Sequence, residues 1–204
     1  MQKFGGYDDA KKQAQASGTS KLPAGGYVCK VIGVKYTKGE EGKSDFIEIQ
    51  FEIAEGEYKG FFQKQYEANT NEDKKYKGRT KIYIPTDDGS EKDGWTKKTF
   101  AGWTNAFEES NEGYLWDWDE KKWKNKLIGI VFGETGTVIN GRDVVYTEAR
   151  FAVSAERIRS GNYPAAKFKA KNGYPSESGS ESSGSDNNGF LNIPEGAVED
   201  LPFD

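Results

Sequence analysis

The chain has 204 residues, of which 34% are hydrophobic and 30% charged, so it has room for one domain with tails or for two small domains. It contains no histidine, which excludes Ser-His-Asp and Cys-His catalysis and most zinc sites, and we expect no catalytic residues, metal or other cofactor. Cys29 is the only cysteine, so we expect no disulfide within the chain. No apolar run approaches the ~20 residues that span a bilayer, and the first residues lack the apolar core of a secretion signal. We therefore expect a cytoplasmic protein with no membrane contact.

Residues 1–21 are polar and are predicted to form an N-terminal arm. Within this arm, Asp8 or Asp9 could cap a short helix that extends to Ala16. The segment "LPAGGY" (22–27) contains turn-forming residues and marks the beginning of the body.

The first two strands are predicted from alternation of apolar and polar residues. The segment "YVCKVIGVKY" (27–36) alternates only if a bulge lies near Gly33, which turns Lys30 and Lys35 to the same outer side. The segment "FIEIQFEIA" (46–54) alternates strictly, with the isoleucines on one side and Phe46 on the other. The two strands therefore form a predicted hairpin around the polar loop 37–45.

The remaining elements follow in the order strand, strand, helix and hairpin. The segments "GFFQKQYE" (60–67) and "TKIYIP" (80–85) are predicted strands. Residues 94–110 are predicted to be helical, because Phe100, Trp103 and Phe107 recur at helical spacing. Residues 127–138 and 142–154 form a predicted hairpin that turns at Asn140-Gly141.

This order predicts a mainly β protein with the outline of an OB-fold, a five-stranded and partly open Greek-key barrel. One helix lies between the third and fourth strands, and residues 68–94 form an insertion. The predicted domain covers residues 22–171. A generic β-sandwich is the competing fold.

Charge is distributed unevenly between the body and the predicted tail. All 29 basic residues lie in residues 1–171, whereas residues 172–204 hold seven acidic residues and no basic residue. The tail is rich in Ser, Gly and acidic residues, and we expect it to be disordered. Such an asymmetry is typical of a polyanion-binding body with an acidic arm, although a solubilising tail would give the same pattern.

Aromatic and basic residues alternate on the outward sides of the predicted strands. This arrangement suits a single nucleic-acid strand, because bases stack on rings while phosphates meet Lys or Arg. The predicted base-stacking residues are Phe46, Phe62, Tyr66, Tyr83, Trp116 and Tyr146. The predicted phosphate-binding residues are Lys30, Lys35, Lys64, Arg79, Lys81, Arg142 and Arg150.

Each of these residues also has an ordinary structural interpretation. Phe62 and Tyr66 could belong to the core, since Phe61 competes with Phe62 for the outward position. Phe46 could cover one end of the barrel, and Trp116 could close its bottom. The basic residues could be solvated surface charges.

The chain resembles the single-stranded DNA-binding proteins of bacteria and their phages. The resemblance rests on the OB-like body, on the Gly/Ser/acid-rich linker and on the terminal "EDLPFD". The phage branch is the more similar one, as judged from the segments "LPAGGYVCKVIGVKY" and "KSDFIEIQFEIAEGEYKG". It implies a non-enzymatic, sequence-tolerant protein of replication, recombination and repair in a bacterial host cell, with a homo-oligomer among its known assembly states. The positions that match the partner-docking tip of that family are Asp200, Leu201, Pro202 and Phe203, although Phe203 is penultimate here.

Three questions stay open at this point. The sequence has no feature that reads a 2′-hydroxyl, so it does not separate DNA from RNA as the ligand. A carbohydrate-binding module would use the same aromatic platforms on a β-fold. A Mg²⁺-dependent nuclease would need acidic residues, for which Asp87, Asp88, Asp117 and Asp119 are candidates.

Overall fold

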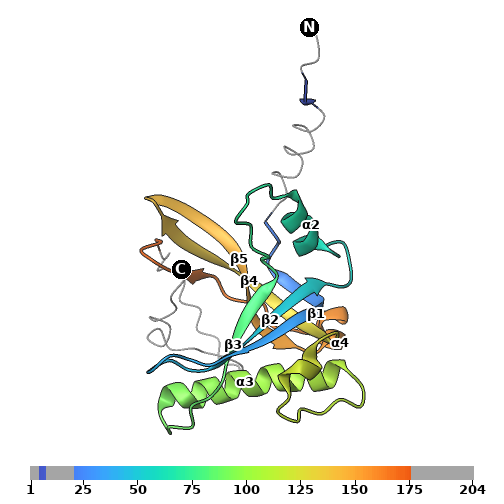
Figure 1. The fold of residues 1–204 in the computed structure, drawn as a ribbon, viewed down its shortest axis with the longest axis vertical. Coiled ribbons are helices and arrows are strands. Elements are labelled where there is room, and N and C mark those ends of the chain that lie inside the picture. Colours follow the sequence, from blue (N-terminus) through green and yellow to red (C-terminus); the bar gives the residue numbers. More distant parts are fainter. Residues whose placement is uncertain (1–4, 8–20, 176–204) are drawn as a thin grey trace, which may run out of the picture.

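The computed structural model describes residues 5–7 and 21–175, which form a mixed α/β fold around one sheet (Figure 1). The predicted arm helix, the tail from residue 176 and its tip lie outside the described residues. The strands are β1 (Gly25–Thr37), β2 (Phe46–Ile53), β3 (Arg79–Tyr83), β4 (Leu127–Ile139), β5 (Arg142–Val153) and β6 (Lys169–Ala170). The helices are α2 (Phe61–Ala68), α3 (Glu91–Ser110), α4 (Ala155–Arg159) and the 3-10 helix η1 (Glu120–Trp123).

The sheet has the strand order β3-β2-β1-β4-β5, with antiparallel neighbours throughout. The sixth strand, β6, pairs in parallel with β4 at Thr135 and Gly136, beyond the point where β4 leaves β1. All strands of the described residues therefore belong to one connected sheet, which does not fit the alternative of a two-sheet sandwich.

The predicted bulge in the first strand is confirmed. The β1–β2 register runs from Val31↔Phe51 to Gly33↔Gln50, so that Ile32 is the extra residue. Before the bulge Cys29 and Val31 are fully buried, and after it Lys35 points outward as predicted. The bulge bends β1, which lets its first half pair with β4 while its second half continues beside β2.

The prediction of a strand at residues 60–67 is wrong, because this segment forms helix α2. Gly60 adopts a left-handed φ of 74°, and the carboxylate of Glu52 accepts hydrogen bonds from the backbone amides of Phe62 (3.1 Å) and Gln63 (2.6 Å). Phe61 and Phe62 are adjacent and both buried, which a helix allows and a strand, with its alternating faces, does not. Glu52 comes from β2, so this capping interaction is invisible to local pattern analysis.

The predicted barrel is not closed: in the described part of the chain, β3 makes no pairing with β5. Two differences from the expected layout explain this result. The third strand of the sheet is the five-residue β3 rather than residues 60–67, and α3 packs against both β3 and β5 at the seam. Figure 1 shows α3 lying across one end of the sheet, where it covers the core.

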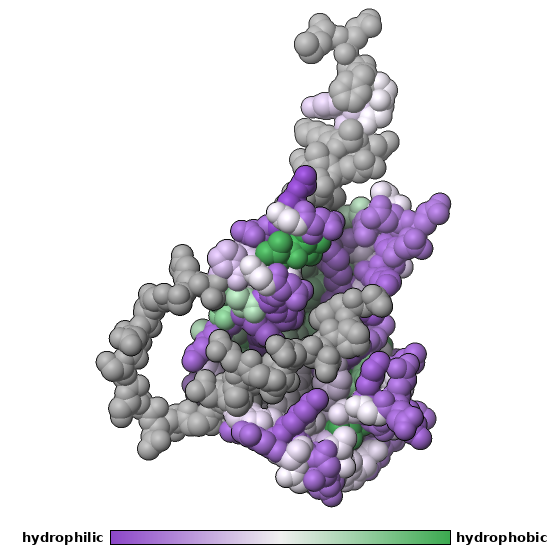
Figure 2. Space-filling model, turned by 90° about the vertical axis from the view of Figure 1, so that its left-hand side faces the viewer, coloured by the Kyte–Doolittle hydropathy of each residue, from purple (hydrophilic) through white to green (hydrophobic). Residues whose placement is uncertain are grey.

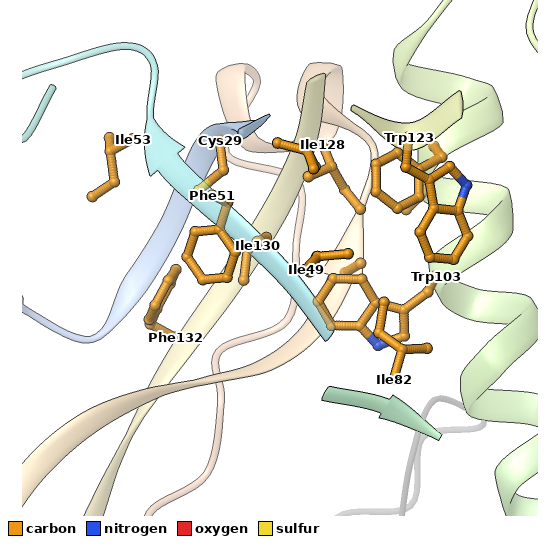
Figure 3. Close-up of a cluster of buried hydrophobic side chains, with 14 of the residues drawn as sticks. Cys29, Ile49, Phe51, Ile53, Ile82, Trp103, Trp123, Ile128, Ile130 and Phe132 are labelled. Carbon is orange, nitrogen blue, oxygen red and sulfur yellow. The ribbon is translucent and has the colours of Figure 1, made fainter. Parts of the chain in front are cut away.

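The core joins the inward side of the sheet to α3 (Figure 3). The helix begins at the N-cap Ser90, whose hydroxyl accepts from the Asp93 amide, and it buries Trp103 and Phe107 as the spacing predicts. Trp123 from η1 is fully buried and stacks on Phe107, with ring centroids 4.6 Å apart. Cys29 lies in the same core, and burial raises the pKa of its thiol.

The predicted β4–β5 hairpin is confirmed, with Asn140 and Gly141 at the turn and φ angles of 51° and 72°. Figure 1 shows its tip projecting away from α3. At the other end, α4 packs against the outer side of β1 and β4, and Gly26 donates its amide hydrogen to Tyr163 at 3.1 Å. No helix of the described residues has the length and apolar character needed to cross a membrane.

Candidate nucleic-acid interface

The second half of β1, together with β2 and β3, presents an outward surface that we call the sheet face. The register aligns its residues in three cross-strand rows, because residues paired across antiparallel strands project to the same side. The rows are Thr37–Phe46–Tyr83, Lys35–Glu48–Lys81 and Gly33–Gln50–Arg79. Five of the predicted site residues thereby come together: Phe46, Tyr83, Lys35, Lys81 and Arg79.

The two rings of the sheet face form one half-exposed aromatic platform. The centroids of Phe46 and Tyr83 lie 6.0 Å apart with the ring planes tilted by 56°. Lys81 Nζ lies 4.6 Å from the centroid of the Phe46 ring, a cation–π distance. Partial burial raises the pKa of the Tyr83 hydroxyl. A base could stack on this platform with its phosphate close to Lys81.

The cations of the sheet face surround a single carboxylate. Glu48 lies between Lys35 on β1 and Lys81 on β3, and Arg79 Nη1 lies 3.9 Å from Glu48 Oε2. The Arg79 side chain is 46% exposed, and an exposed ion pair at this distance contributes little to stability. A phosphate group could therefore replace Glu48 as the partner of Arg79 with little loss of folding free energy. Glu48 is not among the residues predicted from the sequence to form the site.

A second aromatic and basic cluster lies on α2 and the segment that leads into β3. The rings of Tyr66 and Tyr76 lie 6.1 Å apart, and Lys74 Nζ is 4.6 Å from the Tyr66 centroid. Tyr76 donates its hydroxyl hydrogen toward Glu52 Oε2 (2.8 Å) and the Phe51 carbonyl (3.2 Å), which fixes the cluster to β2. Lys64 is exposed on the same helix, and the chain continues from Tyr76 directly to Arg79. The predicted residue Tyr66 thus lies beside the segment that leads into β3, whereas Lys64 is an exposed residue of α2.

Other predicted residues lie elsewhere. Phe62 is 6% exposed and packs against Phe51 and Phe132 in the core, so the prediction that it stacks on a base does not hold in this fold. Trp116 packs between Trp123 and Trp118, with its indole nitrogen buried. It matches the core interpretation, because the loop after α3 folds back over the aromatic end of the core.

Three predicted residues lie on the β4–β5 hairpin rather than on the sheet face. Arg142 is exposed beside the turn, and Tyr146 is half-buried opposite Thr135. The Arg150 guanidinium donates to Glu148 Oε1 (2.7 Å), the Glu134 carbonyl (2.8 Å) and Thr135 Oγ1 (2.6 Å). Arg150 is thereby a structural side chain and not a free surface cation. Lys30 remains exposed, at the end of the sheet face opposite Glu52.

The structure also shows an exposed aromatic residue outside the predicted set. Trp118 is 76% exposed with a φ of 65°, and it stacks on Phe100 at 6.1 Å. Leu115, three residues before it, is exposed to the same extent. The loop composition gives no signal that separates Trp118 from the buried Trp116 and Trp123.

The four acidic residues considered for metal binding have other partners. Asp87 pairs with Lys97, Asp117 pairs with Lys122, and Asp119 caps η1. Hydrogen bonds from Ser90 lower the pKa of Asp88 to about 2. Residues 5–7 and 21–175 contain no group of three or more Cys, Asp or Glu side chains arranged to hold a metal ion.

Comparisons with known proteins assign no family: no protein-family model matches the chain, and no curated protein matches it significantly.

Proposed function

We propose that the protein binds single-stranded DNA without sequence preference, through the sheet face. The observation that carries the proposal is the alignment of Phe46 and Tyr83 with Lys35, Lys81 and Arg79 in adjacent rows. A single strand exposes both base faces and phosphates, whereas a duplex hides its base faces within the stack. Because every base has a π-face, the aromatic platform would accept any sequence, and the cations would hold the backbone.

The strand order supports this proposal. The order β3-β2-β1-β4-β5, with a bulged first strand and α3 between β3 and β4, is that of an OB-fold opened between β3 and β5. OB-folds bind oligonucleotides and oligosaccharides on the face of their second and third strands, flanked by the loops after strands 1 and 4. The corresponding surface here is the sheet face, which is bordered by residues 38–45, the loop between β1 and β2.

The family resemblance adds a second part to the proposal. The protein would act in phage or bacterial DNA replication, recombination or repair, and recruit partner proteins through Asp200, Leu201, Pro202 and Phe203. An aromatic side chain flanked by acidic residues is suited to a basic, apolar-lined pocket on such a partner. RNA is the alternative polymer, since the aromatic platform does not discriminate the sugar.

The proposal is tested by fluorescence titration of the full chain with oligo-dT at several salt concentrations. Affinity should fall with salt by about 0.7 log units per log unit for each phosphate neutralised. The double substitution Phe46→Ala/Tyr83→Ala should weaken binding at least about tenfold, because each stacked base contributes ~1–3 kcal/mol. Trp118→Ala is the matched control, since this exposed ring lies beside α3 and not on the sheet face.

Two outcomes would contradict the proposal. Binding of a soluble oligosaccharide without binding of oligo-dT would favour a carbohydrate module, which uses the same kind of platform. Equal loss of affinity in the Trp118→Ala control would show that the sheet face is not the binding surface.

Incubation of labelled oligo-dT with the protein and Mg²⁺ tests for nuclease activity, which we do not expect.

A further inference from the structure

The aromatic and basic cluster on α2 repeats the geometry of the aromatic platform of the sheet face. On the sheet face, the two ring centroids lie 6.0 Å apart at a tilt of 56°, and a lysine Nζ lies 4.6 Å from one of them. In the cluster on α2, the Tyr66 and Tyr76 centroids lie 6.1 Å apart at a tilt of 58°, and Lys74 Nζ lies 4.6 Å from the Tyr66 centroid. Both tyrosines are half-exposed. The molecule therefore carries a second platform of the same kind, formed by Tyr66, Tyr76 and Lys74.

The second platform lies at one end of the sheet face. Phe46 and Glu52 are six residues apart on β2, so their side chains project to the same, outward side of the sheet. Tyr76 donates its hydroxyl hydrogen to Glu52 Oε2 at 2.8 Å, which places the second platform at the Glu52 end. Figure 1 shows α2, which carries Tyr66, at the end of the sheet opposite α3. Six residues of a strand span roughly 20 Å, which is therefore the approximate separation of the two platforms.

The Glu52 carboxylate fixes the second platform and is itself occupied by donors. Its oxygens accept hydrogen bonds from the backbone amides of Ile53 (2.8 Å), Phe62 (3.1 Å) and Gln63 (2.6 Å) in addition to the Tyr76 hydroxyl. These donors compensate much of its negative charge. Glu52 thus positions Tyr76 against Tyr66 while repelling a nearby phosphate less than a carboxylate without donors would.

Exposed basic residues lie on the segments that connect the two platforms. They occupy the chain between Tyr76 and the end of β3, and the position on β1 that pairs with Glu52. On the side of the molecule that Figure 2 displays, the described residues are mainly hydrophilic, which suits a charged ligand. The exposed basic residues of these segments are Lys30, Lys75, Lys77, Arg79 and Lys81.

We propose that Tyr66, Tyr76 and Lys74 form a second base-binding subsite, and that one single strand bridges the two platforms along β2. A base stacks on the exposed part of the Tyr66 ring, and Lys74 contacts the adjacent phosphate, as Lys81 does beside Phe46. The inference rests on the function proposed for the sheet face and adds a minimum length to its ligand. A separation of roughly 20 Å corresponds to about six nucleotides at the ~3.4 Å spacing of a stacked strand, and to fewer in an extended strand. This length lies within the range of about 4–16 nucleotides that one OB-fold binds.

The subsite is tested by titrating the full chain with two oligonucleotides, dT12 and dT3, of which dT3 is too short to reach both platforms. Tyr66→Leu should weaken dT12 binding at least about fivefold, because it removes one stacked base. The same variant should weaken dT3 binding at most about twofold, because the platform of the sheet face still binds it. Tyr66→Phe is the matched control, since it keeps the ring and removes only the hydroxyl, and it should bind dT12 as the wild type does.

Three outcomes would overturn the second subsite. They are an unchanged dT12 affinity in Tyr66→Leu, an equal loss for dT12 and dT3, and a loss in Tyr66→Phe as large as that in Tyr66→Leu. Retained binding of dT3 by Tyr66→Leu also shows that this variant is folded. Failure of the wild-type chain to bind dT12 would instead refute the function proposed for the sheet face, so the two failures are distinguishable.

Discussion

The sheet face and the base of the β4–β5 hairpin, around Glu148 and Arg150, both pair cations with a carboxylate, but they differ in how far these side chains are exposed. On the sheet face, Arg79 and Lys81 are exposed, and the carboxylate of Glu48 lies 3.9 Å from the Arg79 guanidinium. At the base of the β4–β5 hairpin, Arg150 is only 14% exposed and is fixed by hydrogen bonds to Glu148, Glu134 and Thr135. Alternation along a strand predicts the direction of a side chain, but the neighbouring segments decide whether that side chain is available to a ligand.

The largest expected effect distinguishes the two arginines by stability. Arg150→Ala should lower the free energy of unfolding by about 2–3 kcal/mol, because it leaves Glu148 and Thr135 without a partner in a half-buried position. Arg79→Ala should change stability by less than about 0.5 kcal/mol, because its ion pair is exposed. Urea denaturation of both variants checks this contrast. Equal stability of the two variants would mean that the hydrogen bonds of Arg150 do not stabilise the fold.

A second test sharpens the comparison at the carboxylate of the sheet face. Glu48→Gln should strengthen oligo-dT binding about three- to tenfold, because a carboxylate about 4 Å from a bound phosphate costs about 1 kcal/mol in water. The control is Glu109→Gln, which removes an exposed carboxylate from α3. Titrations at low salt measure the effect. An unchanged affinity in Glu48→Gln would show that phosphates do not approach the middle row.

The smallest effect concerns acid stability at the first turn of α3. Asp93 pairs with Lys97 Nζ at 2.9 Å and accepts from the Asp87 amide at 2.9 Å, and these interactions, above all the one with Lys97, lower its pKa. A lowered pKa stabilises the fold above the unfolded value of about 3.9, and this contribution is lost as pH falls through the lowered value.

Asp93→Asn should therefore make stability less dependent on pH between about pH 4 and pH 2. Urea midpoints across this range provide the measurement, with the exposed Asp73→Asn as control. An identical pH profile in wild type and Asp93→Asn would contradict the assigned role.

Sequence patterns predicted the elements whose signals are local. The strict alternation of residues 46–53, the bulge at Gly33, the helical spacing of Phe100, Trp103 and Phe107, and the turn at Asn140-Gly141 all appear in the structure. Each depends on residues within one element or one turn. The grouping of Phe46, Tyr83, Lys35, Lys81 and Arg79 followed from the same alternation, once the strands were paired.

The failures have non-local causes. Residues 60–67 contain two adjacent Phe and a short polar run, which fit a strand or a helix, and Glu52 of β2 decides in favour of the helix. Arg150 is immobilised by hydrogen bonds to Glu148 and to Glu134 and Thr135 of β4. The exposed Trp118 and the buried Trp123 have similar sequence surroundings, and only the path of the loop separates them.

The inaccessibility of Cys29 makes this protein suited to site-specific labelling. The thiol is fully buried and its pKa is raised, so maleimide dyes should not react with it while the chain is folded. A cysteine introduced in place of the exposed Lys43, in the loop between β1 and β2, would then be the single reactive thiol of the described residues. A dye at this position would report on occupancy of the sheet face without removing any of its cations.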